Sequence, residues 1–186
     1  MANTSDIRVG SIIRFNGDLC TVTDKQHTMP GKGGAFYQVK MKSIKSGRAY
    51  ENRFRSGETV DIARVEYREL AYIYEEGEHL VCMNNETYEQ LHISKSLFGT
   101  NLKFLKEGMI VKIGFESDEP LSAESPTFVE LLITHSEPGI KGDTATNTLK
   151  PATLETGAEI RVPLFVGEGE LVKIDTRTGE YVERVK

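Results

Sequence analysis

The chain has 186 residues and a net charge of −5, with 38% hydrophobic and 27% charged residues, which is typical of a globular protein rather than a disordered or fibrous one. No apolar run approaches the roughly 20 residues that a membrane helix needs. The first twenty residues lack the basic and apolar regions of a secretory signal. We therefore expect a cytoplasmic protein with no membrane partner.

The charge is unevenly distributed along the chain. Residues 1–64 carry 11 Lys and Arg against 6 Asp and Glu, residues 65–127 carry 5 against 12, and residues 128–186 carry 7 against 10. A basic first third favours a polyanionic partner at one end of the molecule, although chance segregation of charge is the alternative. The charge shifts and Ser125-Pro126 place domain boundaries near residues 64 and 127. Segments of about 60 residues are small for independent stability, so neighbours should pack on one another.

The predicted elements are almost all strands. Asn16-Gly17 separates residues 12–15 from 19–23, which indicates a hairpin. Residues 35–42 alternate between a mostly apolar face and a partly basic face, as in a half-buried strand. Only residues 94–105 could hold a turn or two of helix. Many short strands predict an all-β fold of small barrels or sandwiches.

The second and third segments also contain a faint repeat. In residues 108–113 and 157–162, a glycine is followed three residues later by an apolar, a basic and an apolar residue. This repeat favours two similar small barrels.

Sequence signals for catalysis or metal binding are missing. The four histidines lack zinc-ligand spacing, and no Cys-x-x-Cys pair accompanies them. Cys20 and Cys82 are far apart and are expected to be reduced thiols. There is no Gly-x-Ser-x-Gly elbow and no dinucleotide-binding glycine motif. We expect no catalytic residue, no metal and no cofactor.

Residues 29–34, Met-Pro-Gly-Lys-Gly-Gly, lie between two predicted strands. Pro30 fixes its own φ, and Lys32 is the only long side chain of the tip. Three glycines permit the positive φ that a tight turn needs: Gly31, Gly33 and Gly34. The local sequence is compatible with a solubilising turn or with a flexible probe that delivers one ammonium group into a narrow space.

A second motif lies near the C-terminus. The run Lys150-x-Ala152-x₄-Gly157-x₂-Ile160-x-Val162-Pro163-x₂-Val166-x₂-Gly169 resembles, position for position, the signature of the bacterial elongation factor P family. With roughly 5–8% usage per fixed position, chance agreement is on the order of 10⁻⁹. The tip around Lys32 resembles that family's modified-lysine loop, and residues 142–147 and 179–186 also match. The resemblance covers the whole chain.

The resemblance implies an N-terminal SH3-like (KOW-type) barrel at residues 1–64, followed by OB-fold barrels at 65–127 and 128–186, in an L-shaped arrangement similar to a tRNA. It implies a monomeric translation factor, not an enzyme. Such a factor binds the ribosome between the peptidyl and exit sites and relieves stalling at consecutive prolines.

The resemblance also implies roles for particular residues. The Lys32 loop would order the CCA end of peptidyl-tRNA in a near-attack geometry, with Lys32 lengthened by a modifying enzyme. A loop of the third domain would contact mRNA at the exit-site codon: Gly142, Asp143, Thr144, Ala145, Thr146 and Asn147. Tyr181 and Arg184 match residues that the family places near tRNA, although Tyr181 could equally be a core residue. Candidates for phosphate contacts in the basic domain are Arg14, Lys25, Lys40, Lys42, Arg53 and Arg55.

Two departures from the family pattern leave the modification open. Met29 stands where many members carry a basic residue, and Gly34 makes the tip more flexible. The group on Lys32 could be a β-lysyl, an aminopentanol or another group. The alternatives to the factor itself are its paralogue, an enzyme acting on RNA, and a general single-strand RNA-binding OB protein. The last of these would need aromatic platforms and a basic groove.

Overall fold

The protein is described from a computed structural model, which covers residues 2–31, 33–138 and 149–185. Within these residues the only helical element is the 3₁₀ segment η1 (Lys95–Phe104), and the rest of the regular structure is strand. The predicted all-β fold is confirmed. No helix in these ranges is long and apolar enough to cross a membrane.

Contacts divide the chain into two compact units, Met1–Tyr67 with Gly114–Ser122, and Arg68–Ile113 with Ala123–Lys186. The boundaries near 64 and 127 stay a prediction.

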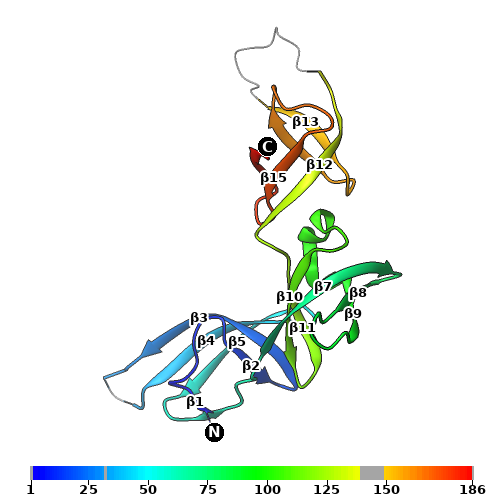
Figure 1. Cartoon of the computed structure of the whole chain (residues 1–186). Coiled ribbons are helices and arrows are strands. Elements are labelled where there is room, and N and C mark those ends of the chain that lie inside the picture. The colour runs from blue at the N-terminus through cyan, green and yellow to red at the C-terminus, as the bar shows by residue number, and fades with distance from the viewer. Residues whose placement is uncertain (1, 32, 139–148, 186) are drawn as a thin grey trace. The chain divides into compact units, whose positions relative to one another are not determined.

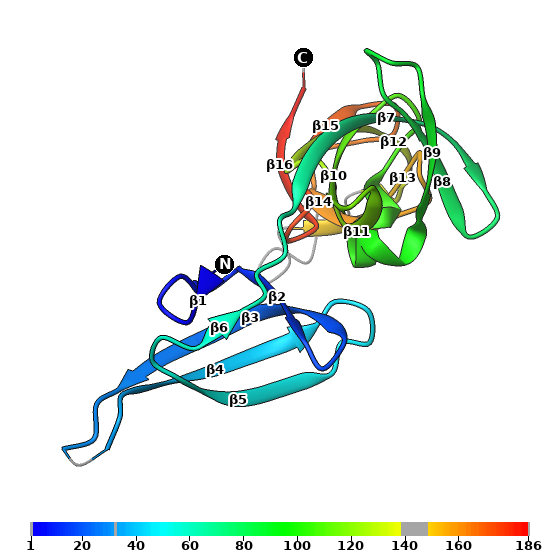
Figure 2. The ribbon, with the colours of Figure 1, turned by 90° about the horizontal axis from the view of Figure 1, so that it is seen from below.

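The first unit contains a four-stranded antiparallel sheet (Figures 1 and 2). In sheet order its strands are β2 (Ile12–Phe15), β3 (Asp18–Thr28), β4 (Phe36–Ser43) and β5 (Ala49–Arg55). A two-stranded ladder joins β1 (Ala2–Asn3) to β6 (Thr59–Val60). Phe15 pairs with Asp18, and the two residues between them have φ of 51° and 80°, which a two-residue hairpin turn requires. The hairpin predicted at Asn16-Gly17 is confirmed.

The alternation predicted for residues 35–42 is also confirmed. Val39 and Met41 are buried in the core of the first sheet, with 0% and 1% of their surface exposed, whereas Lys40 and Lys42 are exposed. Successive side chains of a strand point to opposite faces, so β4 separates a core face from a basic outer face.

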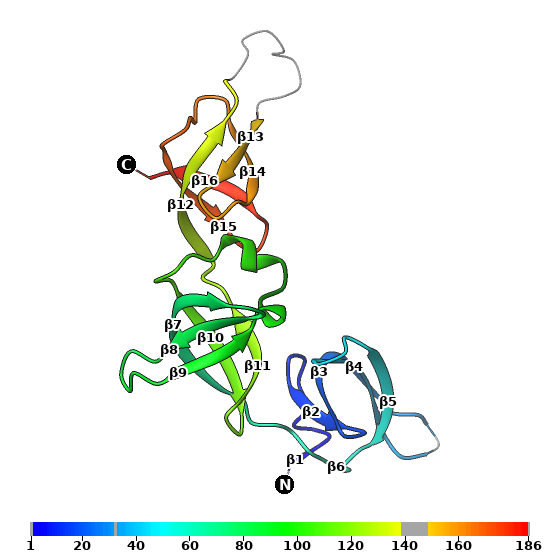
Figure 3. The same cartoon turned by 90° about the vertical axis from the view of Figure 1, so that its right-hand side faces the viewer.

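Two five-stranded sheets follow, and they have the same topology (Figure 3). The first consists of β7 (Glu66–Glu76), β8 (His79–Met83), β9 (Gln90–Ser94), β10 (Ile110–Glu116) and β11 (Glu119–Glu124). The second, called the C-terminal sheet below, consists of β12 (Phe128–Ser136), β13 (Leu149–Leu154), β14 (Glu159–Pro163), β15 (Leu171–Asp175) and β16 (Glu180–Arg184). In each, the third, second, first, fourth and fifth strands lie side by side in that order.

The shared topology confirms the two similar small barrels that the repeat favoured, although the repeated residues themselves do not occupy equivalent strands. Residues 108–113 lead into β10, the fourth strand of its sheet, whereas residues 157–162 lead into β14, the third strand of the other. The repeat therefore aligns strands that are not equivalent. A glycine before an amphipathic strand is a local pattern that recurs without any shared position in the fold.

The C-terminal sheet encloses a core that includes one residue from outside it. Phe104, the last residue of η1, packs with the buried side chains of β12–β15. A Cβ on Gly179 would lie 3.3 Å from the Phe104 ring, and Gly179 has a φ of 74°, so glycine suits this position for two reasons.

Cys20 and Cys82 are both buried and free, and burial raises the pKa of the Cys82 thiol to about 11. Neither cysteine belongs to a disulfide, as the sequence predicts.

Candidate nucleic-acid interface

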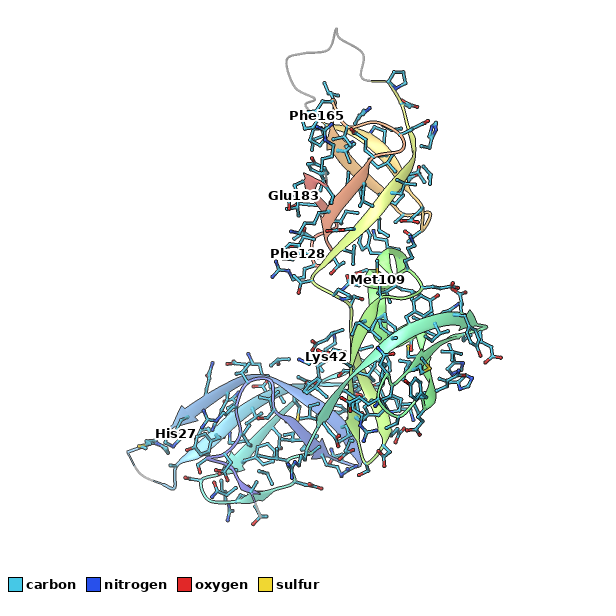
Figure 4. All side chains as sticks on the ribbon, viewed as in Figure 1. His27, Lys42, Met109, Phe128, Phe165 and Glu183 are labelled. Atoms are coloured by element: carbon cyan, nitrogen blue, oxygen red, sulfur yellow. The ribbon has the colours of Figure 1, made fainter. Side chains whose placement is uncertain are left out.

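The long β3–β4 hairpin carries the glycine-rich segment. The two strands pair as far as Thr28 and Phe36, so residues 29–35 form the connection. Figure 4 shows His27 near this end of the hairpin. Lys32 itself lies outside the described residues. Around it, Pro30 is exposed and Gly33 has a φ of 124°, a conformation that favours glycine. Met29 is 74% exposed.

The register of β4 and β5 brings four of the predicted basic residues to one face. Residues directly opposite in an antiparallel pair point to the same side of the sheet. Arg55 pairs with Phe36 and Arg53 with Gln38, so both lie on the outer face that also carries Lys40 and Lys42. Figure 4 shows Lys42 at the other end of the sheet from His27, so these cations run along the length of β4.

A groove of about 580 Å³ lies at the base of the loop, lined by Gly34, Ala35, Phe36, Arg53, Arg55 and Ser56. The Arg53 guanidinium lies over the Phe36 ring, 4.5 Å from its centroid. The backbone N–H of Ser56 donates to the Ala35 carbonyl oxygen at 2.9 Å, which ties the loop base to β5. Within the described residues no carboxylate pairs with the side chains of Lys42, Arg53 or Arg55. The groove therefore offers unneutralised cations beside the loop.

Three of the six predicted basic residues, including Lys40 of the outer face, have partners in the protein. Arg14 lies 3.3 Å from Asp61 and 2.6 Å from Glu116, and Lys40 lies 4.0 Å from Asp24. These ion pairs reduce the net positive charge that Arg14 and Lys40 present to a ligand.

Lys25 takes part in a local structure that the sequence did not reveal. Its ammonium group donates to the carbonyl oxygen of Ile7 at 2.7 Å and lies 4.3 Å from the centroid of the Tyr37 ring. Desolvation, followed by the nearby charge of Arg8, lowers the pKa of Lys25. His27 stacks on the same Tyr37 ring at 4.4 Å and 17°. His27 and Tyr37 are directly opposite each other on β3 and β4. The stack could have been predicted only if the register of these two strands had been known from the sequence.

The C-terminal candidates fall in two groups. Residues 142–147 lie outside the described residues. Tyr181 is half-buried. It packs against the core of the C-terminal sheet and also lines a surface groove. It is therefore partly a core residue and partly accessible to a ligand. Arg184 lies 2.7 Å from Glu170 and 5.9 Å from the Phe165 ring. Hydrogen bonds from the Gly167 N–H and from Arg184 lower the pKa of the Glu170 carboxyl.

A metal site is absent from the part of the chain that the structure describes. No group of three or more His, Cys, Asp or Glu side chains lies close enough there to hold an ion. The groove at the loop base presents cations and an aromatic ring, which suit contacts with phosphates and bases.

Three family models match successive parts of the sequence. They are the Elongation factor P (EF-P) KOW-like domain at residues 3–60, the Elongation factor P (EF-P) OB domain at 65–123, and Elongation factor P, C-terminal at 129–184. The chain belongs to the elongation factor P family. Membership places it among translation elongation factors, and it confirms the KOW-like and OB folds.

Full-length relatives agree. The chain is 51% identical to elongation factor P of Chloroherpeton thalassium and 47% identical to that of Coprothermobacter proteolyticus, covering all of both chains in each case. Among solved structures, the eukaryotic translation initiation factor 5A from Methanococcus jannaschii matches with a TM-score of 0.56 at 21% identity, over 67% of this chain and 90% of that one. This likeness shows a shared fold.

Proposed function

We propose that the chain binds the ribosome between the peptidyl and exit sites and stimulates peptide-bond formation where consecutive prolines stall it. The observation that carries the proposal is the β3–β4 hairpin, which presents a glycine-rich tip beside a groove lined by Arg53 and Arg55, two cations with no carboxylate partner among the described residues. The factor acts in the cytoplasm as a monomer, and the ribosome makes the bond.

The proposed mechanism is positional. Proline reacts slowly because its ring restricts the geometry of attack. The Lys32 loop orders the CCA end of peptidyl-tRNA, which holds the reacting groups in a near-attack arrangement without acid–base chemistry. The outer face of β4 and β5 contacts tRNA phosphates, which positions the tip. Residues 142–147 contact mRNA at the exit-site codon, and Tyr181 and Arg184 contact tRNA.

A modification of Lys32 belongs to the same proposal. A lysine-modifying enzyme adds a group that lengthens the side chain and adds hydrogen-bond donors toward RNA. Mass spectrometry of the native peptide that contains Lys32 should show an added mass, and a peptide found only at the unmodified mass would contradict this part.

The central test is translation of a proline-run reporter in a reconstituted system. Lys32→Ala should fold normally and lose rescue, because the tip has lost its only cationic side chain. Lys45→Ala is a matched control, since Lys45 is an exposed lysine of the β4–β5 connection in the same domain. Wild type should be tested in modified and unmodified forms. Full rescue by Lys32→Ala would overturn the proposed role of the loop.

A further inference from the structure

A second groove, of about 610 Å³, lies on the C-terminal sheet. It is lined by residues of three strands and one turn: Leu149, Pro151, Glu159, Ile160, Arg161, Gly179, Glu180 and Tyr181. β14 and β16 are the two edge strands of this sheet, and both contribute to the lining. The groove is thus the opening of an incompletely closed five-stranded barrel.

The position of the groove in the topology indicates ligand binding. OB folds bind oligonucleotides and oligosaccharides on their second and third strands, next to the loop between the fourth and fifth strands. In the C-terminal sheet these elements are β13, β14 and the turn that ends at Gly179. The groove lies where these three elements meet.

The apolar part of the lining suits a planar ring. Tyr181 is held by the core on one side, so its orientation is fixed by packing. Leu149 is 42% exposed, and Pro151 next to it is also exposed. Stacking of a base on an aromatic side chain contributes about 1–3 kcal/mol.

Arg161 supplies an available positive charge. Four of the five Lys and Arg side chains in residues 129–138 and 149–185 have partners: Lys150 with the Glu137 carbonyl oxygen, Lys173 with Glu183, Arg177 with Asp175 and Arg184 with Glu170. Arg161 alone has no hydrogen-bond or ion-pair partner in these ranges. A guanidinium without a partner beside a groove suits an oxyanion such as a phosphate.

Two carboxylates also face this groove. The side chains of Glu159 and Glu180 are exposed and have no partner in the described part of the sheet. Carboxylate oxygens accept hydrogen bonds from the amino groups of bases, and they repel additional phosphates. A groove lined by one cation and two carboxylates therefore suits a single nucleotide, and it does not suit a duplex backbone.

We propose that this groove binds one unpaired nucleotide, with its phosphate on Arg161, its base against Tyr181 and Leu149, and an amino group of the base on Glu159 or Glu180. A nucleotide of an RNA strand and a free mononucleotide share this chemistry. The inference deepens the contact between Tyr181 and RNA in the function proposed above, and it does not depend on the Lys32 loop.

The test is an NMR titration of the ¹⁵N-labelled full chain with the trinucleotides UGU, UAU, UCU and UUU, and with GMP. Amide shifts should be concentrated at residues 149–151, 159–161 and 179–181, and UUU should bind more weakly than at least one of the others. Tighter binding of a trinucleotide than of GMP assigns the groove to RNA, and equal binding assigns it to a free nucleotide. Absence of shifts in the groove at millimolar ligand would overturn the proposal.

Two variants distinguish specific binding in the groove from a general electrostatic attraction between the nucleotide and the protein. Arg161→Gln should weaken binding at least tenfold and reduce the salt dependence by about one counterion. Lys173→Gln is the matched control, because Lys173 is a cation of the same sheet that already pairs with Glu183. Thermal melts of both variants check that each folds. Equal losses in the two variants would contradict a specific role for Arg161.

The base-reading groups have their own test. The double variant Glu159→Gln and Glu180→Gln should reduce the preference for the amino-bearing bases over UUU while keeping the shifts at Tyr181. An unchanged preference would remove the carboxylates from the proposal.

Tighter binding of the basic peptide Ala-Arg-Ala than of any trinucleotide would overturn the nucleotide proposal in favour of a protein ligand. These measurements need no ribosome, so their failure leaves the rescue of proline runs untouched.

Discussion

The outer face of β4–β5 and the C-terminal sheet both carry several Lys and Arg residues, but they hold them in different surroundings. On the outer face, Lys42, Arg53 and Arg55 have no carboxylate partner among the described residues. On the C-terminal sheet, Lys173, Arg177 and Arg184 each lie within 3.1 Å of a carboxylate oxygen, and Arg161 has no such partner in residues 129–138 and 149–185. Two surfaces with similar numbers of cations therefore present different net charge to a polyanion. The identity of the neighbours, more than the count of cations, decides this net charge.

The largest expected effect removes the free cations of the first surface. The double variant Arg53→Gln and Arg55→Gln should lower ribosome affinity tenfold or more, and should reduce the salt slope by about one per lost phosphate contact. Binding to ribosomes that carry peptidyl-tRNA, measured over a salt series, checks this.

The matched control takes two paired cations. Lys173→Gln with Arg177→Gln removes the same charge from the C-terminal sheet, where both cations already face carboxylates. We expect little change in affinity or salt slope. Equal losses from the two double variants would break the distinction between free and paired cations.

A smaller effect, on stability, is expected at Arg14. This cation of the basic domain is paired with carboxylates, as Lys173, Arg177 and Arg184 are. Arg14 contacts Asp61 and the largely buried Glu116, whose side chain is 16% exposed. The two residues belong to the same compact unit. Arg14→Glu and Glu116→Arg should each destabilise that unit, and the double swap should recover part of the loss, with a coupling of about 0.5–1 kcal/mol.

Chemical denaturation of the four proteins measures this coupling. Additive losses would show that the pair contributes nothing to stability. Arg14→Gln should also leave the salt slope of ribosome binding nearly unchanged, which distinguishes Arg14 from Arg53 and Arg55.

The smallest effect concerns a paired carboxylate and depends on pH. Lys106 lies 2.8 Å from Glu155, and the Leu132 N–H donates to the same carboxylate at 3.0 Å. The hydrogen bond from Lys106 is the main cause that lowers the pKa of Glu155. Because the folded pKa lies below the unfolded one, the stabilisation is present above the ordinary pKa of 4.5 and is lost as the pH falls through the folded value.

Unfolding of wild type and Glu155→Gln at several pH values measures this contribution. The wild type should be more stable at pH 7 by a few tenths of a kcal/mol, as for other solvent-screened pairs, and the difference should shrink toward pH 3. A difference that is the same at pH 7 and pH 3 would contradict the assignment.

Predictions that rest on neighbouring residues agree with the structure. Asn16-Gly17 predicts its hairpin because the turn needs positive φ at two adjacent positions, which only a few residue types adopt readily. The alternation in β4 predicts its buried face because the side-chain period of a strand is fixed. The weak helical signal near residue 100 corresponds to η1, and the C-terminal pattern identifies the family.

Predictions that depend on distant residues are less successful. Six basic residues of the first domain look alike in the sequence, yet Arg14 and Lys25 are held by protein groups while Arg53 and Arg55 line a groove. The repeat between residues 108–113 and 157–162 correctly favours two similar barrels, but it does not identify equivalent strands, since strand order is set by long-range pairing. The groove at Arg161 and Tyr181 joins residues from β13 to β16, which no local pattern connects.

The sequence by itself determined the all-β class, the local hairpins, the glycine-rich tip and the family, because turn chemistry, strand periodicity and fixed motif spacing are local properties of the chain. The tertiary structure decided which cations are neutralised, which aromatic rings stack and where the two grooves open. Those outcomes depend on strand register and on contacts between residues far apart in the sequence, and a one-residue change of register would move each side chain to the opposite face.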